Sequence, residues 1–316
     1  MANLDPKAKA YVEMFNQLPA IHKMEPEAVR EMFADAPPVE VELASLAKVE
    51  DKLIQVGQGE TIKIRIYTPK GEGPLPVFVY YHGGGWVIGD LETSDASCRM
   101  LANRTKRIVV SVDYRLAPEY KFPIPFEDSF AALNWVSEHA KEFNGNASNI
   151  VVGGDSAGGN LAAVVSQAAK DQNGPKVVAQ VLVYPVTALT YDSKSYLDFQ
   201  VGYGLDRDLM IWFGNHYINS KEDARNKYVS PLVAEDLTNL PPALIITAEN
   251  DVLRDEGIEY GKRLKEAGVN VELHCEQGLV HGYFTNMAVF PERIEESINR
   301  IDEFLNKVDQ TVLNKR

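Results

Sequence analysis

The chain has 316 residues, and its 32 Lys and Arg against 45 Asp and Glu leave a net charge of −13. Such an acidic surface repels phosphate backbones and anionic lipids, so we expect neither a nucleic-acid nor a membrane-surface partner. Apolar residues make up 45% and charged residues 24%, which is typical of globular proteins and excludes a disordered or fibrous chain. Two cysteines, Cys98 and Cys275, are too few for a disulfide framework.

The N-terminal segment and the apolar runs bear on localisation. The first twenty residues carry several charges and no continuous apolar core, so we expect no secretory signal peptide. The longest apolar stretches, such as Val77–Tyr81, are far shorter than the roughly 18 residues of a membrane helix. These features predict a cytoplasmic protein without stable membrane association.

The first part of the chain predicts helices and then a strand. Asp5 can cap a helix that opens with Pro6, and a second helix is expected from Pro26 to about Phe33. Thr61–Tyr67 alternates isoleucines with charged residues, which indicates a half-exposed strand.

Short apolar runs then recur along the chain and predict strands that are covered on both faces, as in a parallel sheet. These runs are Val77–Tyr81, Ile108–Val112, Ile150–Val152, Val177–Tyr184, Ala243–Thr247 and Val269–Leu273. Helical patterns separate several of them, and a last amphipathic pattern runs from Ile294 to Val308. The alternation favours an α/β fold with a mostly parallel, doubly wound central sheet flanked by helices.

One interval, between Pro185 and Pro241, breaks this alternation and is rich in Tyr, Asp, Asn and Ser. A structureless loop of that length is uncommon in a compact domain, so we expect a helical insertion. We predict that residues 186–232 and about 1–45 together form a helical cap on a single domain that spans residues 1–316.

The strongest chemical signal is the G-x-S-x-G motif Gly154–Gly158, which lies between the strand Ile150–Val152 and a helical run near Leu161. A strand, a tight turn and a helix are the context of a nucleophile elbow, where glycines leave space around a strained serine. The motif therefore predicts Ser156 as a nucleophile.

A serine hydroxyl needs a base to take its proton. Of the six histidines, His281 follows Gly278 in a loop beyond the last predicted strand, where a base can reach Ser156. His274 ends that strand pattern and is interpreted as a packed or exposed strand residue. We predict His281 as the base, with a structural loop histidine as the alternative.

The strand, turn and helix around Ser156 resemble the nucleophile elbow of α/β-hydrolases, and this resemblance implies an orienting acid between the serine and the histidine in chain order. Asp251 follows the strand Ala243–Thr247 and is the preferred candidate, while Glu249 is its rival near the same strand end. Asp255 is interpreted instead as the cap of a helix over Asp255–Ala267.

A glycine-rich loop, His82-Gly83-Gly84-Gly85-Trp86, follows the strand Val77–Tyr81. It predicts an oxyanion hole made by the backbone N–H groups of Gly83, Gly84 and Ala157. A dinucleotide loop is excluded because Ile88 stands where a third glycine is needed, and a phosphate loop because Asp90-Leu91 replaces Lys-Ser/Thr.

These motifs resemble those of the hormone-sensitive-lipase-like, bacterial family of α/β-hydrolase carboxylesterases, over about Pro76 to Phe284. The resemblance rests on five segments in the family's order: His82–Trp86, Tyr114–Glu119, Gly154–Asn160, Asp251–Gly257 and His281–Tyr283. It implies Ser156 as nucleophile, Asp251 as acid and His281 as base, in agreement with the choice from the residues alone. Val252 departs from the family's proline and Tyr283 from its phenylalanine.

Other polar residues within or beside these motifs are interpreted as structural, namely His82, Arg115, Glu119 and Asp128. Aromatic residues that are candidates for either the substrate pocket or the cap core are Trp86, Tyr184, Tyr191, Tyr203, Trp212 and Phe213.

The expected function is that of a serine carboxylesterase that hydrolyses short- to medium-chain carboxylic esters through an acyl-enzyme intermediate. Two alternatives stay open: an inactive hydrolase fold that binds a small ligand, and an amidase with the same triad. No metal and no organic cofactor are required by this chemistry. A small-molecule ester is the expected partner, and a homodimer is compatible with the sequence.

Overall fold

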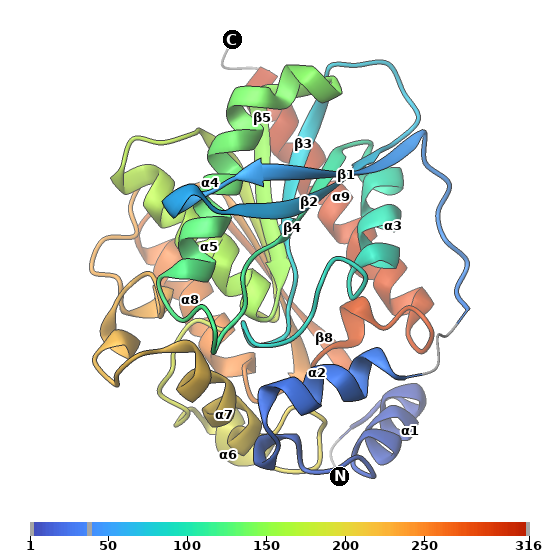
Figure 1. Cartoon of the computed structure of the whole chain (residues 1–316), viewed down its shortest axis with the longest axis vertical. Coiled ribbons are helices and arrows are strands. Elements are labelled where there is room, and N and C mark those ends of the chain that lie inside the picture. The colour runs from blue at the N-terminus through green and yellow to red at the C-terminus, as the bar shows by residue number, and fades with distance from the viewer. Residues whose placement is uncertain (1–2, 37–39, 314–316) are drawn as a thin grey trace.

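The structure is a computed structural model, and it describes residues 3–36 and 40–313. One eight-stranded sheet forms the centre of this part of the chain, in the order β1-β2-β4-β3-β5-β6-β7-β8 (Figure 1). The strands are β1 (Lys48–Gln55), β2 (Thr61–Thr68), β3 (Leu75–Tyr81), β4 (Ile108–Asp113), β5 (Gly145–Asp155), β6 (Val177–Val183), β7 (Ala243–Asn250) and β8 (Val271–Val280). Strands β3 to β8 are parallel to one another, whereas β2 pairs antiparallel with both β1 and β4. The predicted α/β fold with a mostly parallel sheet is confirmed.

Two edge strands differ from the sequence prediction. The pattern of β1 does not predict a strand, because at this edge of the sheet only Ile54 of its residues is buried. Strand β8 begins at Val271 and continues to Val280, past the predicted end at Leu273. The expectation that His274 ends the last strand is therefore wrong, because His274 lies within β8. The residues after Leu273 include His274, Glu276 and Gln277, and these polar residues interrupt the apolar pattern from which the strand was predicted.

Helices connect most of the strands. The α-helices are α1 (Pro6–Phe15), α2 (Pro26–Ala34), α3 (Asp95–Thr105), α4 (Ile124–His139), α5 (Ala157–Asp171), α6 (Lys194–Asp198), α7 (Arg207–Tyr217), α8 (Arg254–Glu266) and α9 (Pro291–Leu313). Single 3-10 turns are η1 (Ile21–Lys23), η2 (Gly57–Gly59), η3 (Ala140–Phe143), η4 (Asp223–Arg225), η5 (Pro231–Val233) and η6 (Tyr283–Thr285). Asp5 Oδ1 accepts a hydrogen bond from the Lys7 N–H at 2.8 Å, which confirms the predicted cap of the first helix.

The start of α8 differs from the prediction. The helix begins at Arg254 with Leu253 as its N-cap residue, so the interpretation of Asp255 as the cap is wrong. Asp255 Oδ2 accepts a hydrogen bond from the Ser195 N–H instead, at 2.8 Å. The acidic side chain therefore connects α8 to the segment around α6 rather than to its own helix.

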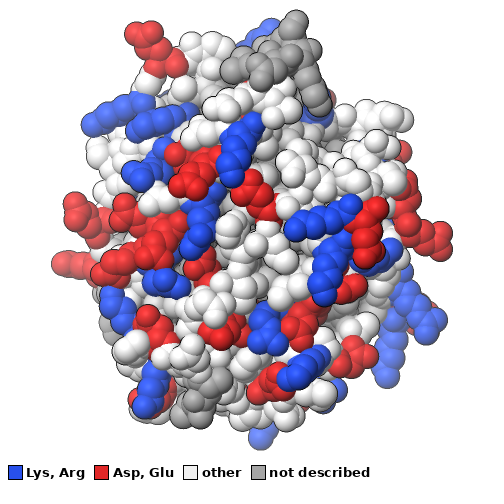
Figure 2. Space-filling view, turned by 180° about the vertical axis from the view of Figure 1, so that it is seen from behind, with Lys and Arg blue, Asp and Glu red and all other residues white. Residues whose placement is uncertain are grey.

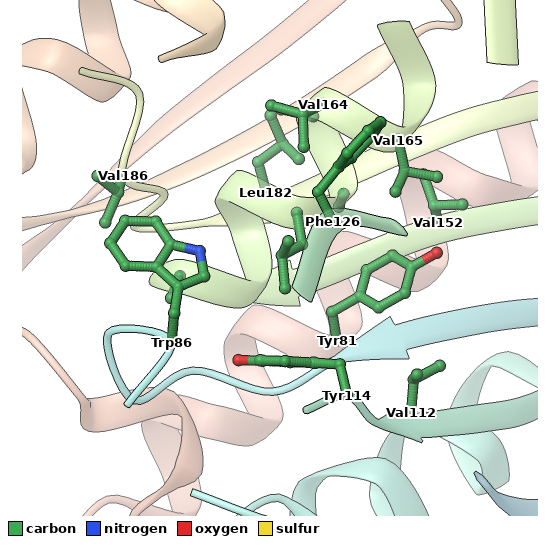
Figure 3. Close-up of a cluster of buried hydrophobic side chains, with 14 of the residues drawn as sticks. Tyr81, Trp86, Val112, Tyr114, Phe126, Val152, Val164, Val165, Leu182 and Val186 are labelled. Carbon is green, nitrogen blue, oxygen red and sulfur yellow. The ribbon is translucent and has the colours of Figure 1, made fainter. Parts of the chain in front are cut away.

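Helices cover both faces of the sheet and bury two apolar cores. Helices α4, α5 and α8 pack on one face, and α3 and α9 pack together on the other (Figure 1). The first core includes Tyr81, Val152 and Leu182, which point into the space between the sheet and its helices (Figure 3). Burial of an aliphatic side chain such as Val152 or Leu182 contributes about 1.5–3 kcal/mol to the stability of the fold.

Helices α1, α2, α6 and α7 lie together at one end of the molecule (Figure 1). The first two and the last two are far apart in the sequence, yet they meet: η1 packs against α7, and Asn16 Nδ2 donates to the Gly202 carbonyl at 3.3 Å. A cavity of about 370 Å³ lies between residues 15–22 and residues 201–209.

Within the described ranges, none of the helices combines the length and the apolar character that crossing a membrane requires. On the face seen in Figure 2, acidic and basic side chains lie interspersed, so the excess of negative charge is not gathered into one acidic patch there.

Candidate active site

Ser156 lies at the turn between β5 and α5, as its motif predicts. Its backbone has φ 56° and ψ −118°, a conformation that a non-glycine residue adopts only when its surroundings enforce it. The Ser156 N–H donates to the Val183 carbonyl at 2.9 Å, and the Ser156 carbonyl accepts from the Asn160 N–H at 3.0 Å. These bonds hold the strained turn and place the hydroxyl beside the first turn of α5.

The two glycines of the motif are required by the neighbouring strand. A Cβ atom on Gly154 would lie 2.2 Å from the Tyr81 carbonyl oxygen, and one on Gly158 would lie 1.9 Å from the same oxygen. Because Tyr81 ends β3, the elbow can pack against this strand only where no side chain intervenes.

Three residues from three strand ends form a hydrogen-bonded relay. His281 Nε2 lies 2.9 Å from Ser156 Oγ, and His281 Nδ1 lies 2.7 Å from Asp251 Oδ2. The carboxylate can only accept, so Nδ1 carries the proton and Nε2 is free to accept the serine proton. Asp251 is 1% exposed, and its Oδ1 accepts from the Leu253 N–H at 2.9 Å.

Parallel strands bring these residues together. β5 ends at Asp155, β7 at Asn250 and β8 at Val280, so the next residue in each case is Ser156, Asp251 or His281. Glu249, the rival acid, lies inside β7, and its Oε2 accepts from the Gly278 N–H at 2.7 Å. The structure thus brings Asp251, and not Glu249, to the imidazole.

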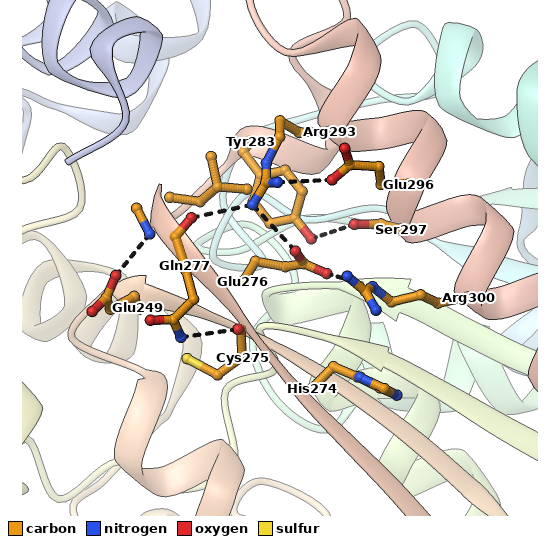
Figure 4. Close-up of polar contacts among 12 residues, drawn as sticks. Glu249, His274, Cys275, Glu276, Gln277, Tyr283, Arg293, Glu296, Ser297 and Arg300 are labelled. Carbon is orange, nitrogen blue, oxygen red and sulfur yellow. Dashed lines mark hydrogen bonds and ion pairs between the residues drawn. The ribbon is translucent and has the colours of Figure 1, made fainter. Parts of the chain in front are cut away.

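The chain on either side of His281 is tied to α9 (Figure 4). Glu276, which is 3% exposed, lies 3.4 Å from Arg293 and 3.0 Å from Arg300. Tyr283 and Ser297 join their hydroxyl groups at 2.8 Å. These contacts limit the movement of the loop that carries the imidazole.

The glycine-rich loop contains one departure from the prediction. The Gly83 N–H donates to Asp155 Oδ1 at 3.0 Å, and that oxygen also accepts from the Tyr80 hydroxyl at 2.7 Å. A donor engaged by a buried carboxyl is not available to a substrate oxygen, so the geometry does not support Gly83 in the oxyanion hole. Burial raises the pKa of Asp155 despite both hydrogen bonds.

Other N–H groups beside Ser156 remain without an acceptor. Among the described residues, the amides of Gly84, Gly85 and Ala157 donate to no protein atom. Gly84 has φ +105° and Gly85 has φ +59°, a region that glycine tolerates best. Sequence reasoning missed Gly85 as a candidate donor, and its place in the glycine run was the available signal.

Of the six candidate pocket aromatics, Tyr184 contacts the imidazole of the relay and Phe213 contacts the glycine-rich loop from outside that loop. The ring centroid of Tyr184 lies 4.5 Å from that of His281, and the ring of Phe213 packs on Gly85. Trp86 is buried and stacks on Tyr217 at 4.2 Å. The remaining three pair with neighbouring aromatics of the insertion; they are Tyr191, Tyr203 and Trp212.

The polar residues interpreted as structural have structural contacts. Arg115 forms a bidentate pair with the buried Asp128, at 2.7 and 2.8 Å. His82 stacks on Tyr114 with ring centroids 4.3 Å apart, and burial lowers the His82 pKa to about 4, which keeps the ring neutral at neutral pH. In residues 3–36 and 40–313, no group of three or more His, Cys, Asp and Glu is arranged to hold a metal ion.

Comparisons of sequence and of overall structure relate this chain to known proteins. A family described as alpha/beta hydrolase fold matches residues 78–285. The chain is 43% identical to the carboxylesterase NlhH of Mycobacterium tuberculosis, over 80% of this chain and 81% of that protein. It is 38% identical to an arylesterase of Saccharolobus solfataricus, over 89% and 92%. A solved structure of a fungal esterase from Rhizomucor miehei superposes with a TM-score of 0.94 at 36% identity, over the full length of both chains.

Proposed function

The chain belongs to the α/β-hydrolase fold family and is a carboxylic ester hydrolase, and we propose that it cleaves short- to medium-chain esters through an acyl-enzyme on Ser156. The observation that carries this proposal is the relay of 2.9 and 2.7 Å through His281 to Asp251. Such a relay activates a hydroxyl that is otherwise a weak nucleophile.

In the first step His281 Nε2 takes the proton of Ser156 Oγ, and the oxygen forms a bond to the ester carbonyl carbon. The carbonyl π electrons move onto its oxygen and give a tetrahedral oxyanion. Asp251 holds the imidazole in the tautomer that can accept this proton and stabilises the imidazolium that results.

The oxyanion needs donors that are not already engaged. We assign this role to the N–H groups of Gly84, Gly85 and Ala157, because the Gly83 amide is held by Asp155. Loss of one such donor typically lowers turnover by roughly 10²–10³.

The first step ends when the tetrahedral intermediate collapses: the alcohol leaves with the proton from His281, and the acyl group stays on Ser156. The second step uses water as the nucleophile. His281 takes a proton from water, whose oxygen attacks the acyl carbon, and the carboxylic acid departs as Ser156 regains its proton.

In this proposal the chain forms a single domain, and residues near 1–45 and 186–232 form a cap over its site. Residues 1–2 and 37–39 of the first segment lie outside the described residues. The contacts between η1 and α7 and between Asn16 and Gly202 support a joint structure. The ring of Phe213 in α7 packs on Gly85 of the glycine-rich loop His82–Trp86, which is called the oxyanion loop from here on. The cap therefore limits the space beside the reacting carbonyl.

Limited space favours small acyl and alcohol groups. The relative from Saccharolobus solfataricus is named an arylesterase, and p-nitrophenyl esters are aryl esters. A small-molecule ester is therefore the proposed partner. A homodimer stays a prediction, which the sedimentation mass of the purified protein would check.

The test is a series of p-nitrophenyl esters with acyl chains of two to eight carbons, run beside the matching p-nitroanilides. We expect ester hydrolysis that is fastest at the short end and Ser156→Ala activity lower by roughly 10⁴-fold or more. Unchanged turnover in Ser156→Ala would contradict the assignment of Ser156 as the nucleophile. Cleavage of the p-nitroanilides at rates comparable to those of the matching esters would show that the enzyme is also an amidase.

A further inference from the structure

Arg30, on the N-terminal helix α2, contacts the loop that carries the proposed oxyanion donors. Its Nε donates to the Val87 carbonyl at 2.8 Å, and its Nη2 donates to the Ala117 carbonyl at 2.7 Å. The same guanidinium pairs with both carboxylate oxygens of Glu119, at 2.8 and 2.9 Å. One side chain thus spans three segments that are distant in the sequence.

We expect the ion pair of Arg30 with Glu119 to contribute little to holding the loop. The side chains of Arg30 and Glu119 are 30% and 52% exposed, and ion pairs this accessible contribute little to stability. The two carbonyl contacts differ, because Val87 is fully buried and the planar guanidinium reaches both carbonyls at once from fixed directions.

The Val87 carbonyl belongs to a tight turn. The N–H groups of Val87 and Ile88 both donate to the Gly84 carbonyl, at 3.0 and 2.9 Å. Trp86, inside the turn, has φ 61°, and the Ala117 N–H donates to its carbonyl at 2.8 Å. Ala117 therefore links the two residues: its carbonyl accepts from the Arg30 guanidinium, and its N–H donates to the Trp86 carbonyl.

A non-glycine residue at positive φ is maintained only where surrounding contacts enforce it. Here the contacts come from Arg30, from Ala117 and from the ring of Tyr217 that stacks on Trp86. The N–H groups of Gly84 and Gly85 lie at the start of this turn, so whatever holds the turn also sets their direction.

We infer that Arg30 is a positioning residue for the oxyanion hole, which couples helix α2 to stabilisation of the transition state through the Val87 and Ala117 carbonyls. The inference rests on the proposed acyl-enzyme mechanism. Displacement of a catalytic group by about 1 Å can cost about 100-fold in rate, so loss of these contacts acts on turnover more than on substrate binding.

The experiment compares Arg30→Ala, Arg30→Lys and Glu119→Gln with Lys121→Ala as the matched control. Lys121 also joins the core to the cap, because its Nζ donates to the carbonyls of Asn215 in α7 and of Ile218, which follows that helix. Within the described residues, its ammonium donates to no atom of the glycine-rich loop His82–Trp86. We measure kcat and KM for p-nitrophenyl butyrate and the inhibition constant of a trifluoromethyl ketone, whose adduct with Ser156 carries an oxyanion. Active sites are titrated with a phosphonate, so that kcat refers to folded enzyme only.

We expect Arg30→Ala to lower kcat by about 10- to 100-fold with KM nearly unchanged, and to weaken the ketone by a similar factor. Arg30→Lys should fall between Arg30→Ala and the unmutated chain, because an ammonium cannot reach both carbonyls in the same geometry. Glu119→Gln and Lys121→Ala should stay within about threefold, since both leave the carbonyl contacts in place. If Arg30→Ala fails to fold, Arg30→Lys carries the same comparison.

A kcat of Arg30→Ala equal to that of Lys121→Ala would overturn the inference, and so would a loss confined to KM. An equal loss in Glu119→Gln would do the same, because it would assign the effect to the ion pair. An unmutated chain that hydrolyses no ester, or a fully active Ser156→Ala, would overturn the proposed function itself.

Discussion

The ring of Phe213 lies directly on Gly85: a Cβ atom on this glycine would fall 2.2 Å from the Cγ and Cδ1 atoms of the ring. Phe213 belongs to the insertion and Gly85 to the loop after β3, so the contact joins two parts of the chain that are distant in sequence. It leaves no room for a side chain at the proposed oxyanion hole.

We therefore expect Gly85→Ala to lower kcat by roughly 100-fold, because the methyl group must displace either the ring or the loop. Adding Phe213→Ala removes the ring and should recover about tenfold of that loss, while Phe213→Ala alone serves as the control. Steady-state kinetics on p-nitrophenyl acetate measures all three. A double variant no faster than Gly85→Ala would show that the clash is not the cause.

The contact of His281 with Asp251 leads to a second prediction. Asp251→Asn should lower kcat by roughly 10⁴-fold, because an amide can donate to Nδ1 and so favour the tautomer that cannot accept from Ser156. Glu249→Gln is the matched control: its oxygen can still accept from the Gly278 N–H, so we expect less than a threefold change. Comparable losses in both variants would contradict the assignment of the acid.

The buried pair of Arg115 and Asp128 predicts an effect on stability rather than on catalysis. Asp128→Ala leaves a guanidinium that is only 12% exposed without its carboxylate, and we expect a loss of about 2–4 kcal/mol in the free energy of unfolding. Asp128→Asn keeps an acceptor for the Arg115 N–H and should lose less. Urea denaturation measures both, and a kcat reduced in the folded Asp128→Ala enzyme would argue for a direct role in the reaction.

Glu256 predicts a pH dependence of stability. Burial raises its pKa to about 8 from an ordinary value of 4.5, although the N–H groups of Thr187 and Ala188 donate to Oε1 and favour the charged form. Between these two pH values the folded chain keeps a proton that the unfolded chain releases. The contribution of Glu256 to the free energy of unfolding therefore falls as pH rises through this window.

Glu256→Gln removes this titration and keeps the oxygen that accepts from Thr187 and Ala188. We expect its melting temperature, relative to that of the unmutated chain, to increase steadily from pH 5 to pH 8. Scanning calorimetry of both chains in matched buffers gives this difference. Parallel profiles over the whole range would mean that Glu256 does not hold a proton in the folded state.

Local patterns were sufficient to predict most strands of the sheet and the three residues that the structure joins in the relay. Apolar runs indicate buried strands, and the turn around Ser156 has glycines that its packing requires. Because the carboxyl ends of parallel strands share one edge, a residue that follows such a strand is expected there whatever its distance in sequence. Strand β1 escaped this reasoning, since an edge strand with one buried residue has no clear apolar period.

The directions of individual groups were decided only by the tertiary structure. Asp155 accepts from the Gly83 amide, whereas the Gly84 and Gly85 amides donate to no atom of the described residues. Glu249 lies within β7, and its carboxylate accepts from the Gly278 N–H. In the sequence, Arg30 is one of several charged residues in a short predicted helix, and nothing there distinguishes it. Its contact with the Val87 carbonyl arises only when the helix packs against that loop. A local pattern sets the period and the turns of the backbone, whereas a hydrogen-bond partner is selected among all residues that the fold brings within about 3 Å.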